Sequence, residues 1–155
     1  VPDTYYGRES QVRAHVPKQI NDFLSPLPDD IYVRSVPDKA DYDLLKAGKH
    51  RGSINHATME PEGGLSVGKG FEFPSKYAYF VKGKKIGIGT DGEPLLDIAT
   101  ARPVGAIMPF NEAYKKYQTM QDSFIKKTFG VPREDVVKYF ARAGFDPMGN
   151  KPAGR

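Results

Sequence analysis

Glycine and proline divide this chain into short segments, and this limits its fold more than any other feature. The 155 residues include 16 glycines and 13 prolines, close to a fifth of the chain. Both residue types interrupt helices and central strands, so we expect many turns and short elements. A composition of 39% hydrophobic and 27% charged residues is globular rather than disordered. The length predicts one domain with a single core over residues 1–155.

Composition also excludes several classes of protein. The sequence has no apolar run of about 18 residues, which predicts that the chain does not insert into a membrane. Its start, Val1-Pro2-Asp3-Thr4, lacks the pattern of a signal sequence and an initial Met, so we expect an excised or processed domain. Without cysteine there are no disulfides, thiolate metal sites or cysteine nucleophiles.

Charge is distributed unevenly along the chain. Residues 113–155 hold nine basic and four acidic residues, whereas residues 1–112 hold 14 and 15. The pairs Lys115-Lys116 and Lys126-Lys127 fall at helical spacing. This basic end is either a solvated helical face or a surface that attracts an acidic or nucleic-acid partner.

The hydrophobic pattern predicts an α+β fold, with helices around short, mostly antiparallel strands. We expect an N-terminal helical segment within 1–30, a short helix over 39–47 and C-terminal helices over 111–145. Strands are expected at 31–36, 64–67, 95–99 and 104–108, with a hairpin over 76–89. Asp38 is expected to cap the short helix, and Leu44 and Leu45 to form its buried face.

Three polar side chains lie on or beside the expected strands, and each has two interpretations. Arg34, within an apolar strand, is either a solvated or salt-bridged surface group or a phosphate clamp. Ser66 lies between glycines, which leave room for a ligand or another backbone, although a serine in a strand is most often structural. Glu93 follows Asp91 by two residues, so both carboxylates point the same way in an extended segment. They are either paired acids of a site or solvated residues of a turn.

The run Gly87-Ile88-Gly89-Thr90-Asp91-Gly92 formally matches the dinucleotide-binding pattern G-x-G-x-x-G. That pattern requires a helix immediately afterwards, so that its N-terminus meets the pyrophosphate. Here a strand-like Pro94-Leu95-Leu96-Asp97-Ile98 follows. We therefore assign these glycines to tight turns rather than to a dinucleotide site.

Two histidines and two tyrosines complete the set of candidate side chains. His50 and His56 lie near Glu60 and Glu62, but this spacing fits no ligand motif, so we expect no metal site. His56 with basic partners could instead cleave RNA by acid–base catalysis. Tyr77 and Tyr79 are expected in or beside the core, where one of them could face a flat aromatic ligand.

The order Arg34, then Gly64-Leu65-Ser66-Val67, then Asp91-Gly92-Glu93 resembles the ADP-ribosyltransferase superfamily, in particular its bacterial toxin and effector branch. That family carries an arginine on its first core strand, then a serine-containing strand, then a carboxylate-x-glutamate turn that enters an apolar strand. The strand-then-helix run over 31–48 also looks like the opening of several C-terminal toxin domains. Two departures are visible. The serine strand reads Leu-Ser-Val rather than Ser-Thr-Ser, and the first acid is Asp91 rather than Glu or Gln.

The resemblance implies a split pair of small antiparallel sheets around a cleft, with flanking helices, that binds NAD as a substrate. Arg34 would hold the pyrophosphate, and Ser66 would order the nicotinamide ribose and Glu93. Tyr77 or Tyr79 would stack near the nicotinamide. Glu93 would stabilise the oxocarbenium-like state as nicotinamide leaves, and Asp91 would position or deprotonate the acceptor.

The leading hypothesis is therefore a secreted toxin or effector domain that serves bacterial antagonism in a target-cell cytoplasm. As an ADP-ribosyltransferase, a kind of glycosyltransferase, it would modify a protein or RNA, and an immunity or inhibitor protein would be a further partner. One alternative is a metal-independent ribonuclease toxin that uses His56 and basic residues. The other is a non-catalytic binding module that uses the basic helices.

Overall fold

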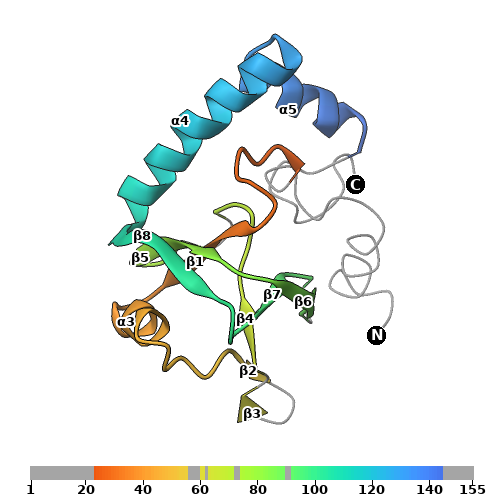
Figure 1. Ribbon diagram of the computed structural model, residues 1–155. Helices are drawn as coiled ribbons and strands as arrows, with labels where there is room; N and C mark the ends of the chain where they lie inside the picture. The colour runs from red at the N-terminus through yellow and green to blue at the C-terminus, as the bar shows by residue number, and fades with distance from the viewer. Residues whose placement is uncertain (1–22, 56–59, 62, 72–73, 90–91, 145–155) are drawn as a thin grey trace. The chain divides into compact units, whose positions relative to one another are not determined.

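The computed structural model describes residues 23–55, 60–61, 63–71, 74–89 and 92–144 (Figure 1). Most of the N-terminal helical segment expected within 1–30 lies outside the described residues. His56, Glu62 and Asp91 also lie outside them. The α+β class is confirmed. A single domain was expected from the length, but the chain divides into two compact units. One consists of residues 27–115, and the other of residues 1–26 and 116–155.

Two three-stranded antiparallel sheets form most of the unit of residues 27–115. The first has the order β1-β5-β8, from strands Ile31–Val36, Tyr77–Lys82 and Arg102–Pro109. The second has the order β4-β7-β6, from strands Gly64–Ser66, Pro94–Asp97 and Lys85–Ile88. A small additional pair joins β2, Ile54–Asn55, to β3, Glu60–Pro61. The four predicted single strands are all present, with small differences at their ends.

The hairpin predicted over 76–89 is wrong. β5 and β6 belong to different sheets, and β6 forms its hairpin with β7. The physical reason is that both edges of β5 are occupied, one by β1 and the other by β8. Gly83 lies where the chain passes from one sheet to the other, and a Cβ there would come within 3.2 Å of Ala101 Cα and Leu96 Cδ1.

The two sheets are joined by one pair of backbone hydrogen bonds among the described residues. Val33 of β1 and Gly68, just beyond β4, exchange these bonds at 2.6 and 2.9 Å. The Lys69 ammonium reinforces the junction, because it donates to the carbonyl groups of Pro28 and Ile31. Away from this junction β1 and β4 do not pair. Backbone groups of β4 that face β1 must therefore find other partners.

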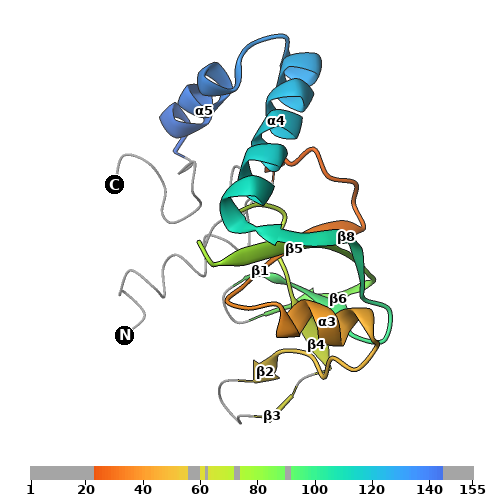
Figure 2. The same ribbon diagram turned by 90° about the vertical axis from the view of Figure 1, so that its left-hand side faces the viewer.

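One hydrophobic core is shared by both sheets and by α3, Ala40–Lys46. Its buried members are Tyr32, Val36, Tyr42, Leu45, Leu65, Val67, Tyr79, Val81, Leu96 and Ala101. Figure 2 shows α3 lying along the sheet of β1, β5 and β8. The Tyr42 hydroxyl fixes this position by donating to the Gly105 carbonyl of β8 at 2.9 Å.

The short helix α3 forms where the sequence predicted it, with one error in its buried face. Asp38 accepts a hydrogen bond from the Ala40 N–H at 2.9 Å, but the N-cap residue of α3 is Lys39, one residue after the predicted cap. Leu45 is buried, but Leu44 is 46% exposed and Tyr42 is buried instead. Residues three apart share a helix face, whereas adjacent residues do not, so Tyr42 and Leu45 form the pair.

The described part of the second unit contains the predicted C-terminal helices. They are α4, Phe110–Phe129, whose first six residues belong to the other unit, and α5, Arg133–Arg142. A buried cluster of Leu24, Ile125 and Val136 holds this unit together. Gly130, with φ of +75°, ends α4 as predicted. None of the described helices is long and apolar enough to cross a membrane.

Candidate functional site

Arg34 lies on the face of its sheet that is turned toward the core. Along β1 it shares this face with Tyr32 and Val36, both members of the buried core. The strand register places it opposite Tyr79 of β5. Its side chain is only 18% exposed and forms a salt bridge with Asp41. Arg34 is therefore salt-bridged, as its first interpretation allowed, but it is not a solvated surface group.

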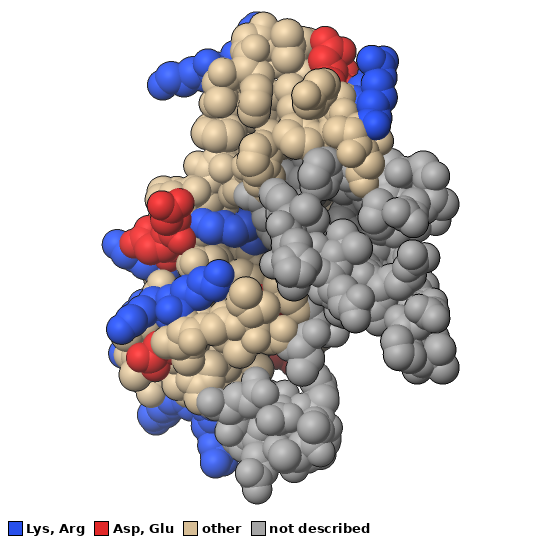
Figure 3. Space-filling model, turned by 90° about the vertical axis from the view of Figure 1, so that its right-hand side faces the viewer, with Lys and Arg blue, Asp and Glu red and all other residues tan. Residues whose placement is uncertain are grey.

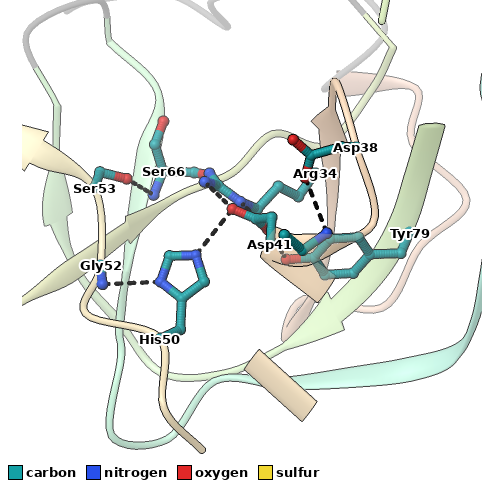
Figure 4. A network of polar contacts seen from close by, with 9 residues as sticks. Arg34, Asp38, Asp41, His50, Gly52, Ser53, Ser66 and Tyr79 are labelled. Carbon is teal, nitrogen blue, oxygen red and sulfur yellow. Dashed lines mark hydrogen bonds and ion pairs between the residues drawn. The ribbon is translucent and has the colours of Figure 1, made fainter. Parts of the chain in front are cut away.

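Asp41, which the sequence did not single out, is the centre of the polar network shown in Figure 4. Its Oδ1 accepts from Arg34 Nε at 3.0 Å and its Oδ2 from Arg34 Nη2 at 2.8 Å. The Tyr79 hydroxyl donates to Oδ1 at 2.6 Å, and His50 Nε2 lies 2.9 Å from Oδ2. Donors from β1, from β5 and from the loop after α3 thus converge on one carboxylate.

The contacts of His50 assign its tautomer and its role. The Gly52 N–H donates to Nδ1 at 2.9 Å, so Nε2 carries the proton that Asp41 accepts. With both nitrogens engaged and a side chain that is 9% exposed, His50 supports Asp41. Among the residues that the structure describes, no group of three His, Cys, Asp or Glu side chains could hold a metal ion.

Electrostatics keep Asp41 charged and Tyr79 protonated near neutral pH. Burial opposes the charge on Asp41, but the hydrogen bonds and charge of Arg34 outweigh it and hold the pKa of Asp41 well below its usual range. Burial and the hydrogen bond to Asp41 raise the pKa of Tyr79 well above its usual value. Asp41 and Arg34 are therefore an ion pair, and Tyr79 remains a protonated donor.

Ser66 lies at the point where β1 and β4 diverge. Its backbone N–H and carbonyl groups form hydrogen bonds with side chains there. Arg34 Nη1 donates to the Ser66 carbonyl at 2.7 Å, and Ser53 Oγ accepts from the Ser66 N–H at 2.9 Å. The structure thus brings Arg34 and Ser66 together, through the backbone of Ser66 rather than its hydroxyl. These contacts and those to Asp41 use three of the five guanidinium N–H donors of Arg34.

Glu93 ends the turn between β6 and β7. The residues just beyond β4 lie between this turn and β1. The Val67 N–H donates to the Pro94 carbonyl at 3.1 Å, which continues the pairing of β4 with β7 and brings Glu93 opposite Gly68. Gly68 is in turn bridged to Val33. The backbone at Gly68 therefore lies between Glu93 and Val33 of β1.

The Glu93 carboxylate differs from every other carboxylate among the described residues. Its Oε2 atom is buried and accepts no hydrogen bond. A buried polar atom without a partner costs free energy, so natural proteins retain few of them and often do so at functional sites.

The remaining predicted site residues divide between exposed and buried positions. Tyr77 is half-buried beside the core, with Lys39 Nζ 5.5 Å from its ring centroid. Tyr79 has no exposed surface, so it cannot stack on a ligand, and the predicted stacking role is left to Tyr77 alone. Asp91 and His56 lie outside the described residues.

A signal for Asp41 was present in the sequence. Asp41 precedes the buried Leu45 by four residues, so the two share one face of α3. An acidic residue on a buried helix face needs a cationic or hydrogen-bonding partner. Arg34, on the strand just before the helix, is the partner that this rule would have proposed.

The basic C-terminal segment does not concentrate its charge. α4 carries four lysines and two acidic residues, and α5 carries three basic and two acidic residues. On the face seen in Figure 3, the basic side chains of the described residues stand at separate points, some with acidic ones beside them.

Comparison with protein-family models gives no match, and comparison with curated proteins and with solved structures gives no significant match. Inference about function therefore depends on the residues of this chain and on their geometry.

Proposed function

We propose that this chain is a mono-ADP-ribosyltransferase domain, which transfers ADP-ribose from NAD to a macromolecule, either protein or RNA. The observation that carries the proposal is the contact between Arg34 and Ser66 at the parting of the two antiparallel sheets, with Glu93 one strand further on. These are the arginine, serine and glutamate that the resemblance singled out, and they lie in the same unit, on β1, on β4 and in the turn before β7.

In the proposed reaction Glu93 acts on the nicotinamide ribose. Its unpartnered Oε2 accepts a hydrogen bond from a ribose hydroxyl, and its negative charge stabilises the positive charge that develops on the sugar. The bond between the sugar carbon and the nicotinamide nitrogen breaks, and its electron pair neutralises the cationic ring. A nucleophile of the acceptor then bonds to that carbon, and Asp91 takes the proton it loses.

Arg34 would bind the pyrophosphate in a restricted way. Asp41 accepts hydrogen bonds from Nε and Nη2 of Arg34, and the Ser66 carbonyl accepts one from Nη1. Two N–H donors remain for phosphate oxygens. The ion pair thus fixes the plane of the guanidinium before NAD arrives, which lowers the ordering cost of binding.

The resemblance also supports the biological setting of the proposal. The chain would be a secreted effector domain that acts in a target-cell cytoplasm, with an immunity or inhibitor protein as its antagonist. No step in the proposed reaction needs a metal, because the charges are supplied by Glu93, Arg34 and the cationic nicotinamide ring.

Release of nicotinamide from NAD by the purified chain, with and without a lysate as a source of acceptors, is the direct test. We expect Glu93→Gln to lower the rate by about 100-fold or more, since it removes the charge that stabilises the transition state. Glu112→Gln, at an exposed position of α4, is the matched control and should release nicotinamide like the wild type. Equal rates for wild type and Glu93→Gln would contradict the role of Glu93.

The same preparations separate the two alternatives. Cleavage of bulk RNA without NAD, lost in His56→Ala, would favour the ribonuclease. If neither NAD nor RNA is turned over, and crystals soaked with NAD show nothing beside Arg34, the chain is a binding module.

A further inference from the structure

Gly89 is the residue on which the Glu93 carboxylate rests. A Cβ atom built on Gly89 would lie 2.0 Å from Oε1, 2.5 Å from Cδ and 3.1 Å from Oε2 of Glu93. The carboxylate therefore occupies the space that any side chain at position 89 would fill. Gly89 also belongs to the G-x-G-x-x-G run, for which the sequence indicated only tight turns.

The backbone conformation and hydrogen bonds of Gly89 do not themselves require glycine. Its φ angle is not in the left-handed region, whereas that of Gly92, three residues later, is +80°. Its N–H donates to the Glu93 carbonyl at 2.7 Å and its carbonyl accepts from the Gly92 N–H at 2.9 Å. Alanine could make both bonds, so only the space above the Cα atom distinguishes the two residues here.

We infer that Gly89 is a positioning residue for Glu93. The absence of a side chain at position 89 lets the carboxylate fold back over the β6–β7 turn, where Oε2 is buried and unpartnered. A carboxylate held in this way is shielded from water, so its attraction for a ligand hydroxyl is stronger than it would be in solution. The identity of that hydroxyl, on the ribose of NAD, rests on the proposed function.

Substituting Gly89 should move the carboxylate and leave the fold unchanged. The atoms that a new Cβ would meet are all at the end of the Glu93 side chain, which can rotate to another staggered rotamer at small cost. Gly87, two residues earlier on β6, has open space around its Cβ position and no left-handed φ. Gly87→Ala is therefore a matched control for Gly89→Ala.

Nicotinamide release by the full chain tests this inference through kcat and KM. We expect Gly89→Ala to lower kcat by about 10-fold to 100-fold with little change in the KM for NAD, because the lost interaction is made mainly in the transition state. Gly87→Ala should keep the wild-type kcat. In the Glu93→Gln background Gly89→Ala should have no further effect, since both substitutions remove the same interaction. A wild-type kcat in Gly89→Ala would overturn the inference.

A second measurement needs no substrate. The ¹³C chemical shift of the Glu93 carboxyl group, followed by NMR, should change in Gly89→Ala and stay at its wild-type value in Gly87→Ala. If this shift changes while the wild type releases no nicotinamide, the positioning role stands and the proposed function fails. An unchanged carboxyl signal in Gly89→Ala would overturn the positioning role.

A third variant covers the case in which Gly89→Ala does not fold. Glu93→Asp shortens the side chain by one methylene and removes the clash, so the double variant Gly89→Ala/Glu93→Asp should unfold at a wild-type temperature. A double variant that is still unfolded would show that Gly89 shapes the turn and not the carboxylate, and would overturn the inference.

Discussion

Two carboxylates of the unit over residues 27–115 have opposite surroundings. Asp41 accepts hydrogen bonds on both oxygens, from Arg34, Tyr79 and His50. Glu93 buries one oxygen that accepts none. A carboxylate that accepts hydrogen bonds on both oxygens stabilises the fold and has few acceptor sites left for a ligand. A buried carboxylate oxygen without a partner destabilises the fold but keeps its acceptor sites. The contrast indicates a structural role for Asp41 and supports the proposed role of Glu93 in binding or catalysis.

The largest effect on stability is expected when the Asp41 carboxylate is removed. Asp41→Ala leaves the Arg34 guanidinium mostly buried without its counter-charge, which should lower the free energy of unfolding by about 3 kcal/mol. Urea unfolding of the wild type and the variant measures this loss of free energy. The control is Asp30→Ala, which breaks the exposed Lys82–Asp30 pair, whose side chains are 62% and 51% exposed, and should cost less than about 1 kcal/mol. Equal losses would show that Asp41 has no special structural role.

Removing one donor to Asp41 should have a smaller effect. Tyr79→Phe deletes the hydroxyl that donates at 2.6 Å and should lower the free energy of unfolding by about 1–2 kcal/mol, since the carboxylate keeps Arg34 and His50. Tyr77→Phe, two residues earlier on β5, removes a hydroxyl that makes none of the described hydrogen bonds. Thermal and urea unfolding measure both variants. Equal changes in the free energy of unfolding would show that the Tyr79 hydroxyl makes no specific contribution to stability.

Acid should weaken the contribution of Asp41 in a defined direction. Because the pKa of Asp41 is lowered in the folded protein, the unfolded chain binds its proton first as pH falls below about 4. The stabilisation is complete above that pH and is lost progressively below it, by about 1 kcal/mol at pH 3. The stability difference between wild type and Asp41→Asn should therefore narrow between pH 6 and pH 3, roughly the acid range in which free aspartate titrates. A constant difference would mean that the ion pair does not depress this pKa.

The smallest stability effect, and one of opposite sign, is expected for Glu93. Glu93→Gln replaces a buried charge that lacks a partner by a neutral group, so the free energy of unfolding should stay the same or rise by up to about 1 kcal/mol. Urea unfolding beside Asp41→Asn makes the comparison direct. A large loss of stability in Glu93→Gln would show that Glu93, like Asp41, holds the fold together.

The short strands could be predicted because local residues determine them. Short apolar runs beside turn residues predicted β1 and β7, and Gly130 lies at the end of α4 with a left-handed φ angle. These signals act within a few residues, so no knowledge of tertiary pairing is needed. Arg34 and Ser66 could be selected for the same reason, since each belongs to a recognisable strand.

Tertiary pairing explains what could not be predicted. The error over 76–89 arose because a turn between two strands predicts a hairpin unless both edges of the first strand are taken. Asp41 was missed because its partners lie seven to 38 residues away and meet only in the folded core. The contact between Gly89 and the Glu93 carboxylate likewise cannot be predicted from the sequence, because it depends on the position of the Glu93 side chain in the folded protein.

The order in which the chain visits its two sheets has a consequence for how this unit can be dissected. β1, β5 and β8 make one sheet, while β4, β6 and β7 make the other, so neither comes from a continuous stretch. A cut anywhere between Ser66 and Glu93 divides both sheets and separates Arg34 from Glu93. Residues 31–109 should therefore unfold in one cooperative step, and no shorter fragment should keep the binding half of the site.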